Sequence, residues 1–211
     1  MKTMVLAADI WHSAESIKPM VDLLYPEHDC FFTTDPKAFL KDEYDLLINF
    51  KDPIENNQIP TPTWADETWT DALLSRVRAG MGAIIFHAGM ADLPGDHPMV
   101  RELIHGTFLF HPAQCPVSFE PVKEHPILNG IRAFTLPEPD EHYHIGMLPG
   151  AEAEIIGETV SEHGRQPGLW LHEYGHGRVC MFTPGHVTPN LIDPNMIAIF
   201  RNMIHWCLHE T

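Results

Sequence analysis

Short apolar runs alternate with amphipathic stretches along the first half of the chain. Met4–Ala8 and Asp45–Phe50 are apolar runs with little alternation, a pattern that favours strands of a parallel sheet covered on both faces. From Ser13 onward, apolar residues repeat at helical spacing, and serine is a preferred residue at a helix start. Cys30–Thr33 is a weaker strand candidate. The pattern predicts a strand, a helix and two further strands in that order.

A second helix and strand follow a polar loop. The loop, Lys51–Thr63, contains three prolines, which are unsuited to a central strand. Asp66–Ala79 then carries apolar residues at helical spacing and stops at Gly80, a residue suited to a left-handed helix end. The strand Ala83–Phe86 comes next and ends in His87. Because ligands bind at the carboxyl edge of open α/β sheets, His87 is a candidate site residue.

The second half of the chain is patterned mainly as strands separated by turns. The strand candidates are Pro116–Val122, Glu141–Met147, Ala153–Val160, Gly168–Glu173 and Arg178–Phe182. A helix with one apolar face returns at Pro194–His209. We find no internal repeat and no domain boundary, so one domain over residues 1–211 is predicted. Its class is α/β, with a doubly wound, mostly parallel sheet flanked by helices.

Composition and charge narrow the class of protein. Of 211 residues, 44% are hydrophobic and 9% aromatic, which suffices for a sizeable core. The 13 Lys and Arg against 29 Asp and Glu give a net charge of -16, which repels phosphate backbones and anionic lipid. No apolar run approaches the roughly 20 residues that span a bilayer, and the amino terminus reaches Asp9 before any signal-peptide core develops. We expect a soluble cytoplasmic protein with neither a nucleic-acid nor a membrane partner.

The cysteines give no sign of a metal or disulfide site, whereas the histidines are unusually many. The four cysteines lie far apart without a CxxC pair, so neither a zinc knuckle nor a disulfide scaffold is indicated. The 15 histidines are the oddity of the composition, because imidazole titrates near neutral pH and binds metals readily. They are dispersed rather than gathered in short tracts, which disfavours a metal-storage protein. The histidines therefore direct attention to a folded site.

Six short strings stand in one order over more than a hundred residues. They are Gly80–Ala88, Gly106–Pro112, His125–Ile131, Asp140–Tyr143, Tyr174–Val179 and Pro184–His186. Together they resemble the ThuA family, the trehalose-utilisation-like proteins, over most of the chain. The resemblance implies a flavodoxin-like fold of the class I glutamine amidotransferase type. It also implies a role in carbohydrate metabolism, on a keto-sugar, a glycoside or a related derivative.

One position departs from the amidotransferase pattern. Those enzymes place a cysteine nucleophile at a tight strand-to-helix elbow of the form GxCxG, and the corresponding run here is Ile85–Gly89, with His87 at the position of the cysteine. None of the four cysteines lies near this elbow in the sequence, so a thiolate nucleophile has no candidate there. Glutaminase activity is therefore not expected.

Four side chains are expected to meet at the carboxyl edge of the sheet: His12, His87, Glu141 and His186. Two chemistries remain open. In the first, His12, Glu141 and His186 bind one divalent metal, zinc or manganese, which polarises a ketone while His87 removes the neighbouring proton. In the second, Glu141 and His87 or His186 form an acid/base pair without a metal. No nucleotide cofactor is expected.

Strand alternation separates the residues around Glu141 into two sets. Asp140, His142 and His144 would lie on one face, and Glu141 and Tyr143 on the other. We expect Glu141 and Tyr143 to face the site. The other set is then expected to be a solvated face.

Four further residues are candidates for substrate contact. Trp11 is a sugar-stacking candidate beside the site, and Trp64 ends the proline-rich loop that could fold over the same mouth. His111 stands in a His-Pro turn. Arg178 opens an apolar strand, so that its guanidinium either enters the pocket or pairs with a surface carboxylate.

The leading hypothesis is a carbohydrate-active isomerase, lyase or hydrolase. Its partner would be a small carbohydrate, and homo-oligomer formation stays open. The alternative is a non-catalytic sugar-binding or regulatory protein that kept the amidotransferase-like shell. A binding module needs hydrogen-bond donors and a stacking ring, but not several titratable groups at one point.

Overall fold

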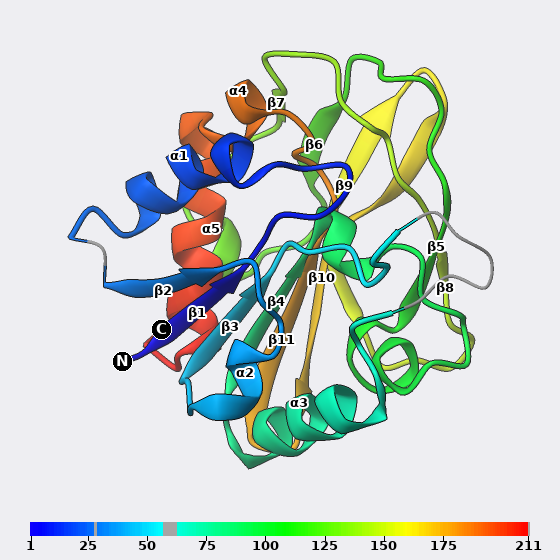
Figure 1. Cartoon of the computed structure of the whole chain (residues 1–211). Helices are drawn as coiled ribbons and strands as arrows, with labels where there is room; N and C mark the ends of the chain where they lie inside the picture. Colours follow the sequence, from blue (N-terminus) through cyan, green and yellow to red (C-terminus); the bar gives the residue numbers. More distant parts are fainter. Residues whose placement is uncertain (28, 57–62, 211) are drawn as a thin grey trace.

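A large mixed sheet forms the centre of the molecule. The computed structural model describes residues 1–27, 29–56 and 63–210 (Figure 1). In these ranges the sheet has nine strands in the order β2-β1-β3-β4-β11-β10-β9-β6-β7. A second, two-stranded sheet pairs β5 (Gly106–Phe110) with β8 (His144–Met147). The predicted α/β fold, a sheet flanked by helices, is confirmed.

The two halves of the large sheet differ in strand direction. The parallel half consists of β2 (Cys30–Thr33), β1 (Thr3–Leu6), β3 (Leu46–Asn49), β4 (Gly82–Phe86) and β11 (Gly177–Phe182). The antiparallel half adds β10 (Gly164–Tyr174), β9 (Glu154–Ser161), β6 (Ser118–Pro121) and β7 (Phe134–Thr135). The carboxyl ends of β1, β3, β4 and β11 therefore lie side by side at one edge.

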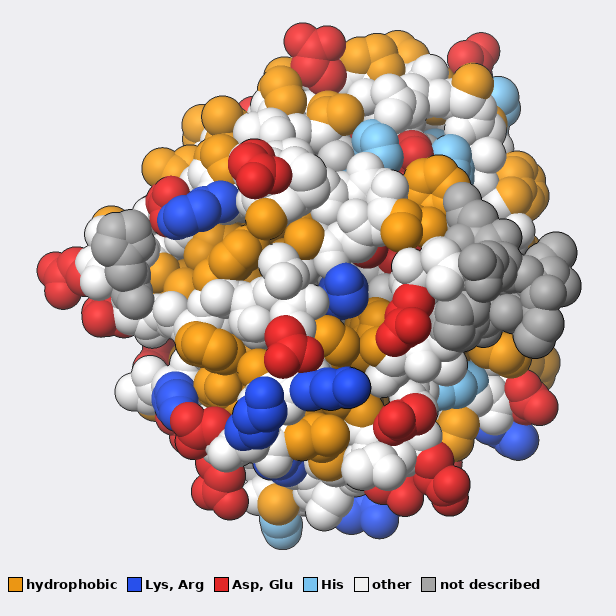
Figure 2. All heavy atoms as spheres, in the orientation of Figure 1, with side chains coloured by type: hydrophobic (Ala, Val, Ile, Leu, Met, Phe, Trp, Pro, Cys, Tyr) orange, Lys and Arg blue, Asp and Glu red, His pale blue; other side chains and the backbone are white. Residues whose placement is uncertain are grey.

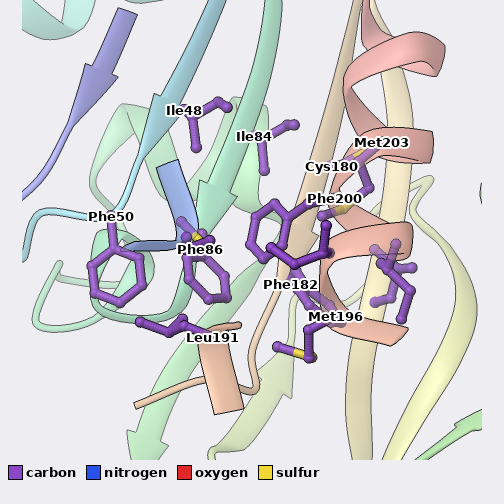
Figure 3. Close-up of a cluster of buried hydrophobic side chains, with 14 of the residues drawn as sticks. Ile48, Phe50, Ile84, Phe86, Cys180, Phe182, Leu191, Met196, Phe200 and Met203 are labelled. Atoms are coloured by element: carbon purple, nitrogen blue, oxygen red, sulfur yellow. The ribbon is translucent and has the colours of Figure 1, made fainter. Parts of the chain in front are cut away.

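Hydrophobic residues on both faces of the parallel strands bury two cores. On one face, α1 (Ala14–Leu24) and α5 (Pro194–Cys207) pack on a cluster that contains Phe86, Phe182 and Phe200 (Figure 3). The rings of Phe86 and Phe200 meet edge to face with centroids 4.7 Å apart. On the other face, α2 (Ala38–Lys41) and α3 (Glu67–Ala79) cover the second cluster. Burial on both faces explains why these strands show little polar alternation.

The predicted helix boundaries rest on local contacts. Ser13 caps α1, since its side chain accepts a hydrogen bond from the backbone N–H of Ser16. Asp66 caps α3 in the same way through the N–H of Trp69. Gly80 ends α3 with φ 127°, a conformation that a side chain would strain. These helix starts and this helix end are confirmed.

Several short elements have no counterpart in the prediction, among them α2 and β5. The others are the 3₁₀ helices His87–Met90 (η1) and Pro126–Leu128 (η3), the π-helix Val100–Ile104 (η2), the strand β7 and the helix Thr188–Leu191 (α4). The predicted strand Glu141–Met147 begins only at His144, because residues 140–143 leave the sheet to form part of the site described below. No helix in the described ranges combines the length and apolar character needed to cross a membrane.

Candidate active site

His87 occupies a tight elbow at the end of β4. Its φ is 45° and its side chain is fully buried. A Cβ at Gly89 would lie 2.3 Å from the carbonyl oxygen of Asn49, so only glycine fits behind the elbow. The Nδ1 of His87 lies 2.7 Å from the carbonyl oxygen of Thr183, which can only accept, so Nδ1 carries the proton. Nε2 is left with a lone pair and has no hydrogen-bond partner among the described residues.

His12 follows β1 and is oriented by an aspartate. Its Nδ1 lies 3.0 Å from Oδ1 of Asp9, which also accepts the backbone N–H of His12 and of Trp11. Burial opposes ionisation of Asp9, but these hydrogen bonds, that to the imidazole above all, lower its pKa. Burial lowers the pKa of His12 despite the aspartate. His12 is therefore neutral near pH 7, with Nδ1–H donated to Asp9 and an Nε2 lone pair that faces Nδ1 of His186.

His186 follows β11 and is held through its backbone. The N–H groups of Gly185 and His186 donate to the Asp140 carboxylate at 2.7 and 2.9 Å. The Nδ1 of His186 lies 2.9 Å from Nε2 of His12 and 3.3 Å from Oε2 of Glu141. The hydrogen bond to Glu141 raises the pKa of His186. Asp140 is thus a positioning residue for the loop after β11.

Glu141 lies among the imidazoles. Its Oε2 is 3.5 Å from Nε2 of His87, and its Oε1 is 3.6 Å from Nε2 of His111. Burial alone would raise the pKa of Glu141, but the hydrogen bond from His186 and the nearby imidazole of His87 hold that pKa well below its usual range. The carboxylate is therefore ionised, and three imidazoles surround it.

Three of these side chains have the donor set of a cation site. One ring nitrogen each from His12, His87 and His186 lies within 4.8 Å of the other two. A zinc ion lies about 2.0–2.1 Å from each nitrogen ligand, so the side chains must adjust their separations for all three to bind one ion. Asp9 and the Thr183 carbonyl accept from the opposite nitrogens of His12 and His87, as is usual for metal-bound histidine. The ligand set predicted from the sequence had Glu141 in place of His87.

A cavity of about 470 Å³ opens on this cluster. Trp11, 56% exposed, lies at its rim, and Phe108 and Tyr143 add aromatic wall. Tyr143 is buried and stacks on His87 at 4.3 Å, and burial holds the pKa of its phenol well above the usual value. In Figure 2, histidine side chains gather around an acidic one at the upper right of the face, apart from its Lys and Arg side chains. Aromatic side chains thus line one part of the cavity, and titratable side chains line the other.

Most predicted site residues meet here, and two predictions need correction. Arg178 does not line the cavity: its Nη1 donates to the Trp206 carbonyl oxygen at 3.0 Å, and its Nε lies 3.4 Å from Glu173. The reason is its place at the start of β11, whereas the cavity lies past the end of that strand. Trp64 is buried, its Nε1 donating to the Asp52 carbonyl, and it lies outside the cavity lining. Residues 57–62 of the predicted loop fall outside the described residues.

The set expected to be solvated is instead buried or half-buried. Asp140 and His142 are 0% and 1% exposed. The Nδ1 of His142 lies 2.7 Å from Oγ of Ser161, and His144 stacks on Phe110 at 4.4 Å. The expectation of a solvated face was wrong because β9 lies against His142, β5 against His144, and the loop after β11 against Asp140. Glu141 and Tyr143 do line the cavity.

Three aspartates of the site were missed from the sequence: Asp9, Asp52 and Asp92. Asp9 orients His12, while Asp52 and Asp92 line the cavity. Asp9 and Asp52 each come three residues after a strand, β1 and β3, so the strand-exit position that pointed to His12 applied to them too. Position after a strand end therefore indicates a site role for aspartate as well as for histidine and glutamate.

Comparison with known proteins gives one family and several structures of the same fold. The model of the ThuA family, which is described as trehalose utilisation, matches residues 6–207 of this chain. A ThuA-like protein from Parabacteroides merdae superposes with a TM-score of 0.78 at 15% identity, covering 100% of this chain and 91% of that one. One from Bacteroides uniformis gives 0.72 at 19%, covering 98% and 91%.

A Salmonella typhimurium protein described as cytoplasmic gives a TM-score of 0.61 at 13% identity, covering 100% of this chain and 99% of that one. At these identities the structures show a common fold and no more. A search of curated proteins finds no match.

Proposed function

The chain belongs to the ThuA family, and from that premise we propose that its histidine and glutamate cavity is the active site of an enzyme acting on a keto-sugar or glycoside derivative. One observation carries this proposal. The Glu141 carboxylate lies within 3.6 Å of the imidazoles of His87, His111 and His186, in a cavity large enough for a small carbohydrate. Converging titratable groups are typical of proton-transfer chemistry rather than of binding alone.

We further propose that His12, His87 and His186 hold a divalent cation such as zinc or manganese. The neutral state of His12 and the unpartnered Nε2 of His87 support this, because one ring nitrogen of each of the three histidines lies within 4.8 Å of the other two. Such an ion, when bound, supplies Lewis-acid polarisation of a carbonyl or hydroxyl oxygen. His87 would then act as a ligand, and Glu141 would be the base.

The protein's own groups account for the proton transfers. Ionised Glu141 accepts a proton from the carbon next to a sugar carbonyl, which is the first step of isomerisation, epimerisation or elimination. Tyr143 keeps its phenol proton and donates a hydrogen bond to a substrate oxygen. Trp11 offers a flat ring to the sugar's C–H face. In the version without a metal, protonated His186 serves as the acid opposite Glu141.

Metal content tests the cation site. Protein purified without chelator or affinity metal should hold about one equivalent of ion, and His186→Ala should hold much less. His205→Ala is the matched control, because His205 is an exposed histidine paired with Glu210. If the parent and His186→Ala hold equal amounts of metal, or if neither binds the ion after it is added, the proposed ligand assignment is wrong. The acid/base pair without a metal would then be the remaining mechanism.

Turnover tests catalysis against binding alone. Glu141→Gln should abolish turnover of keto-sugars or glycosides while sugar affinity stays within about tenfold, roughly 1.4 kcal/mol. The non-catalytic alternative is favoured by a single observation, the replacement of the amidotransferase cysteine by His87 at the elbow. Sugar binding without any turnover in the parent protein would decide for that alternative.

A further inference from the structure

The turn after β1 has a backbone conformation that a residue with a side chain rarely adopts. Ala8, two residues beyond the end of β1, has φ 69°, in the left-handed region that favours glycine. The turn is closed by a hydrogen bond from the N–H of Asp9 to the carbonyl oxygen of His12 at 3.0 Å. Such a conformation persists only where surrounding contacts hold it, and it is typical of functional sites.

This turn determines where His12 lies. Oδ1 of Asp9 accepts from the N–H groups of Trp11 and His12 at 2.8 Å each, and it lies 3.0 Å from Nδ1 of the His12 ring. The Asp9 side chain is fully buried. Because Asp9 directly follows Ala8, the backbone conformation of Ala8 sets the direction in which that carboxylate leaves the chain. A change at Ala8 would therefore displace both the carboxylate and the ring that it orients.

Two hydrogen bonds from the neighbouring loop hold the turn in place. β1 and β3 are adjacent parallel strands, so the loops that follow them lie side by side (Figure 1). From the loop after β3, the Lys51 ammonium group donates to the carbonyl oxygen of Ala8, and the N–H of Asp52 donates to Oδ2 of Asp9 at 2.9 Å. The second bond comes from the backbone, which any residue except proline supplies. The first needs a long side chain that ends in a donor, so it is the bond that the sequence specifies.

The charges around Lys51 suit this role. Burial lowers the pKa of Lys51, whereas the carboxylates of Asp9, Asp52 and Glu55 favour its charged form. A charged donor makes a stronger hydrogen bond to a carbonyl oxygen than a neutral donor does. The ammonium group thus holds the Ala8 carbonyl and places a positive charge near the buried Asp9 carboxylate.

Lys51 acts from outside the cavity of the candidate site. The described residues that line that cavity do not include it. Together with Ala8 and Asp9, it lines a neighbouring cavity of about 590 Å³ instead. Its effect on the histidines must therefore pass through Ala8 and Asp9.

We propose that Lys51 is a positioning residue of the candidate site. Its ammonium group keeps Ala8 in the left-handed turn, the turn places the Asp9 carboxylate, and the carboxylate fixes the orientation and the tautomer of His12. The inference rests on the proposed function only in taking His12 as a site residue.

Cobalt(II) binding to the metal-free protein tests the proposal, because cobalt accepts the same imidazole ligands as zinc and its visible absorption reports them. Lys51→Met keeps an apolar stem and loses the ammonium group, so cobalt affinity should fall about tenfold. Lys51→Arg keeps a cationic donor and should bind within about threefold of wild type. Lys18→Met, which removes an exposed lysine of α1 paired with Asp22, is the matched control and should bind as wild type does. Equal cobalt affinity in wild type and Lys51→Met would overturn the proposal.

A glycine at position 8 tests whether the turn carries the effect. Glycine adopts positive φ without strain, so the turn should no longer need Lys51. Ala8→Gly combined with Lys51→Met should therefore recover cobalt affinity to within about threefold of wild type. His209→Gly relieves another left-handed residue, with φ 59° after α5, and should not rescue Lys51→Met. Without recovery in the Ala8→Gly double variant, the route through Ala8 would be wrong.

Nitrogen NMR of the histidine rings tests the same proposal without a metal ion. Near neutral pH, His12 of the wild type should carry its proton on Nδ1, because Asp9 accepts it. Lys51→Met should populate both tautomers, and the added Ala8→Gly should restore the Nδ1–H form. The His12 signals are identified by their absence from His12→Gln.

These readouts separate the inference from the proposed function. An unchanged His12 tautomer in Lys51→Met would overturn the role of Lys51, whether or not the wild type binds cobalt. A wild type that binds no cobalt but shows the expected tautomer change would overturn the proposed cation site and support the positioning role.

Discussion

The Nδ1 of His186 lies 2.9 Å from the Nε2 of His12, although 174 positions separate the two residues in the chain. Two neutral imidazoles cannot both direct lone pairs at each other without repulsion. Either a proton on His186 or a cation must therefore lie between these nitrogens. In the protein without a cation, Glu141 favours the proton on His186 by its charge. The two rings thus need a proton or a cation between them.

The aspartate behind His12 should control how tightly a cation is held. Asp9→Ala removes the acceptor of the His12 Nδ1–H, so the ring loses its orientation and its fixed tautomer. We expect metal affinity to fall about 10- to 100-fold. A chelating dye in competition with the protein measures this. Asp45→Ala, which removes an exposed aspartate at the opposite end of β3, should leave the affinity unchanged.

The elbow after β4 should tolerate no side chain at Gly89. An added Cβ would lie 2.3 Å from the Asn49 carbonyl oxygen, which is backbone and cannot rotate away. Gly89→Ala should therefore lower the free energy of unfolding by about 1–3 kcal/mol. Gly95→Ala is the control, because its Cβ would meet only a side-chain oxygen at 3.5 Å. Urea denaturation of the two variants gives the comparison, and equal stability would show that the loop moves to make room.

The phenylalanine cluster between the sheet and α5 should carry a large share of the stability. Phe200 is fully buried against Phe86 and Phe182 (Figure 3). Phe200→Ala should cost about 3–5 kcal/mol through lost burial and a cavity. Phe110, which is 53% exposed, offers the matched substitution, and Phe110→Ala should cost much less. Equal losses in thermal or urea unfolding would contradict this core.

Burial raises the pKa of Asp52 to about 7, which predicts that the stability of the protein depends on pH. Its folded value of about 7 lies above the ordinary 3.8, so the native state binds the proton more tightly than the unfolded chain. The stabilisation is complete below about pH 4 and is lost as the pH rises to about 7, at most about 4 kcal/mol. Asp52→Asn should therefore gain stability relative to wild type between about pH 5 and 8. Urea unfolding at about pH 5 and about pH 8 measures the gain. Asp71→Asn, which replaces an exposed aspartate on α3, should show no gain.

The elements of the sheet that carry the site were predictable because local patterns produce them. Apolar runs such as that of β4 are buried on both faces, and Ser13 and Gly80 act on backbone groups within one helical turn. The edge position of His12, His87 and His186 follows from those strand ends. The same reasoning excludes Arg178 from the site, because Arg178 opens its strand and so lies at the edge of the sheet opposite the cavity.

The sequence by itself determined the α/β class, the helix caps and the family, all of which depend on neighbours along the chain or on short strings. Only the tertiary structure decided which polar groups touch. Asp140 reaches the backbone of His186 across 46 positions, and Asp9 accepts the backbone N–H of Asp52 across 43. Such contacts depend on sheet order and loop paths, and they set the pKa values through burial and distance. The chemistry of the site is therefore a property of the fold rather than of any one motif.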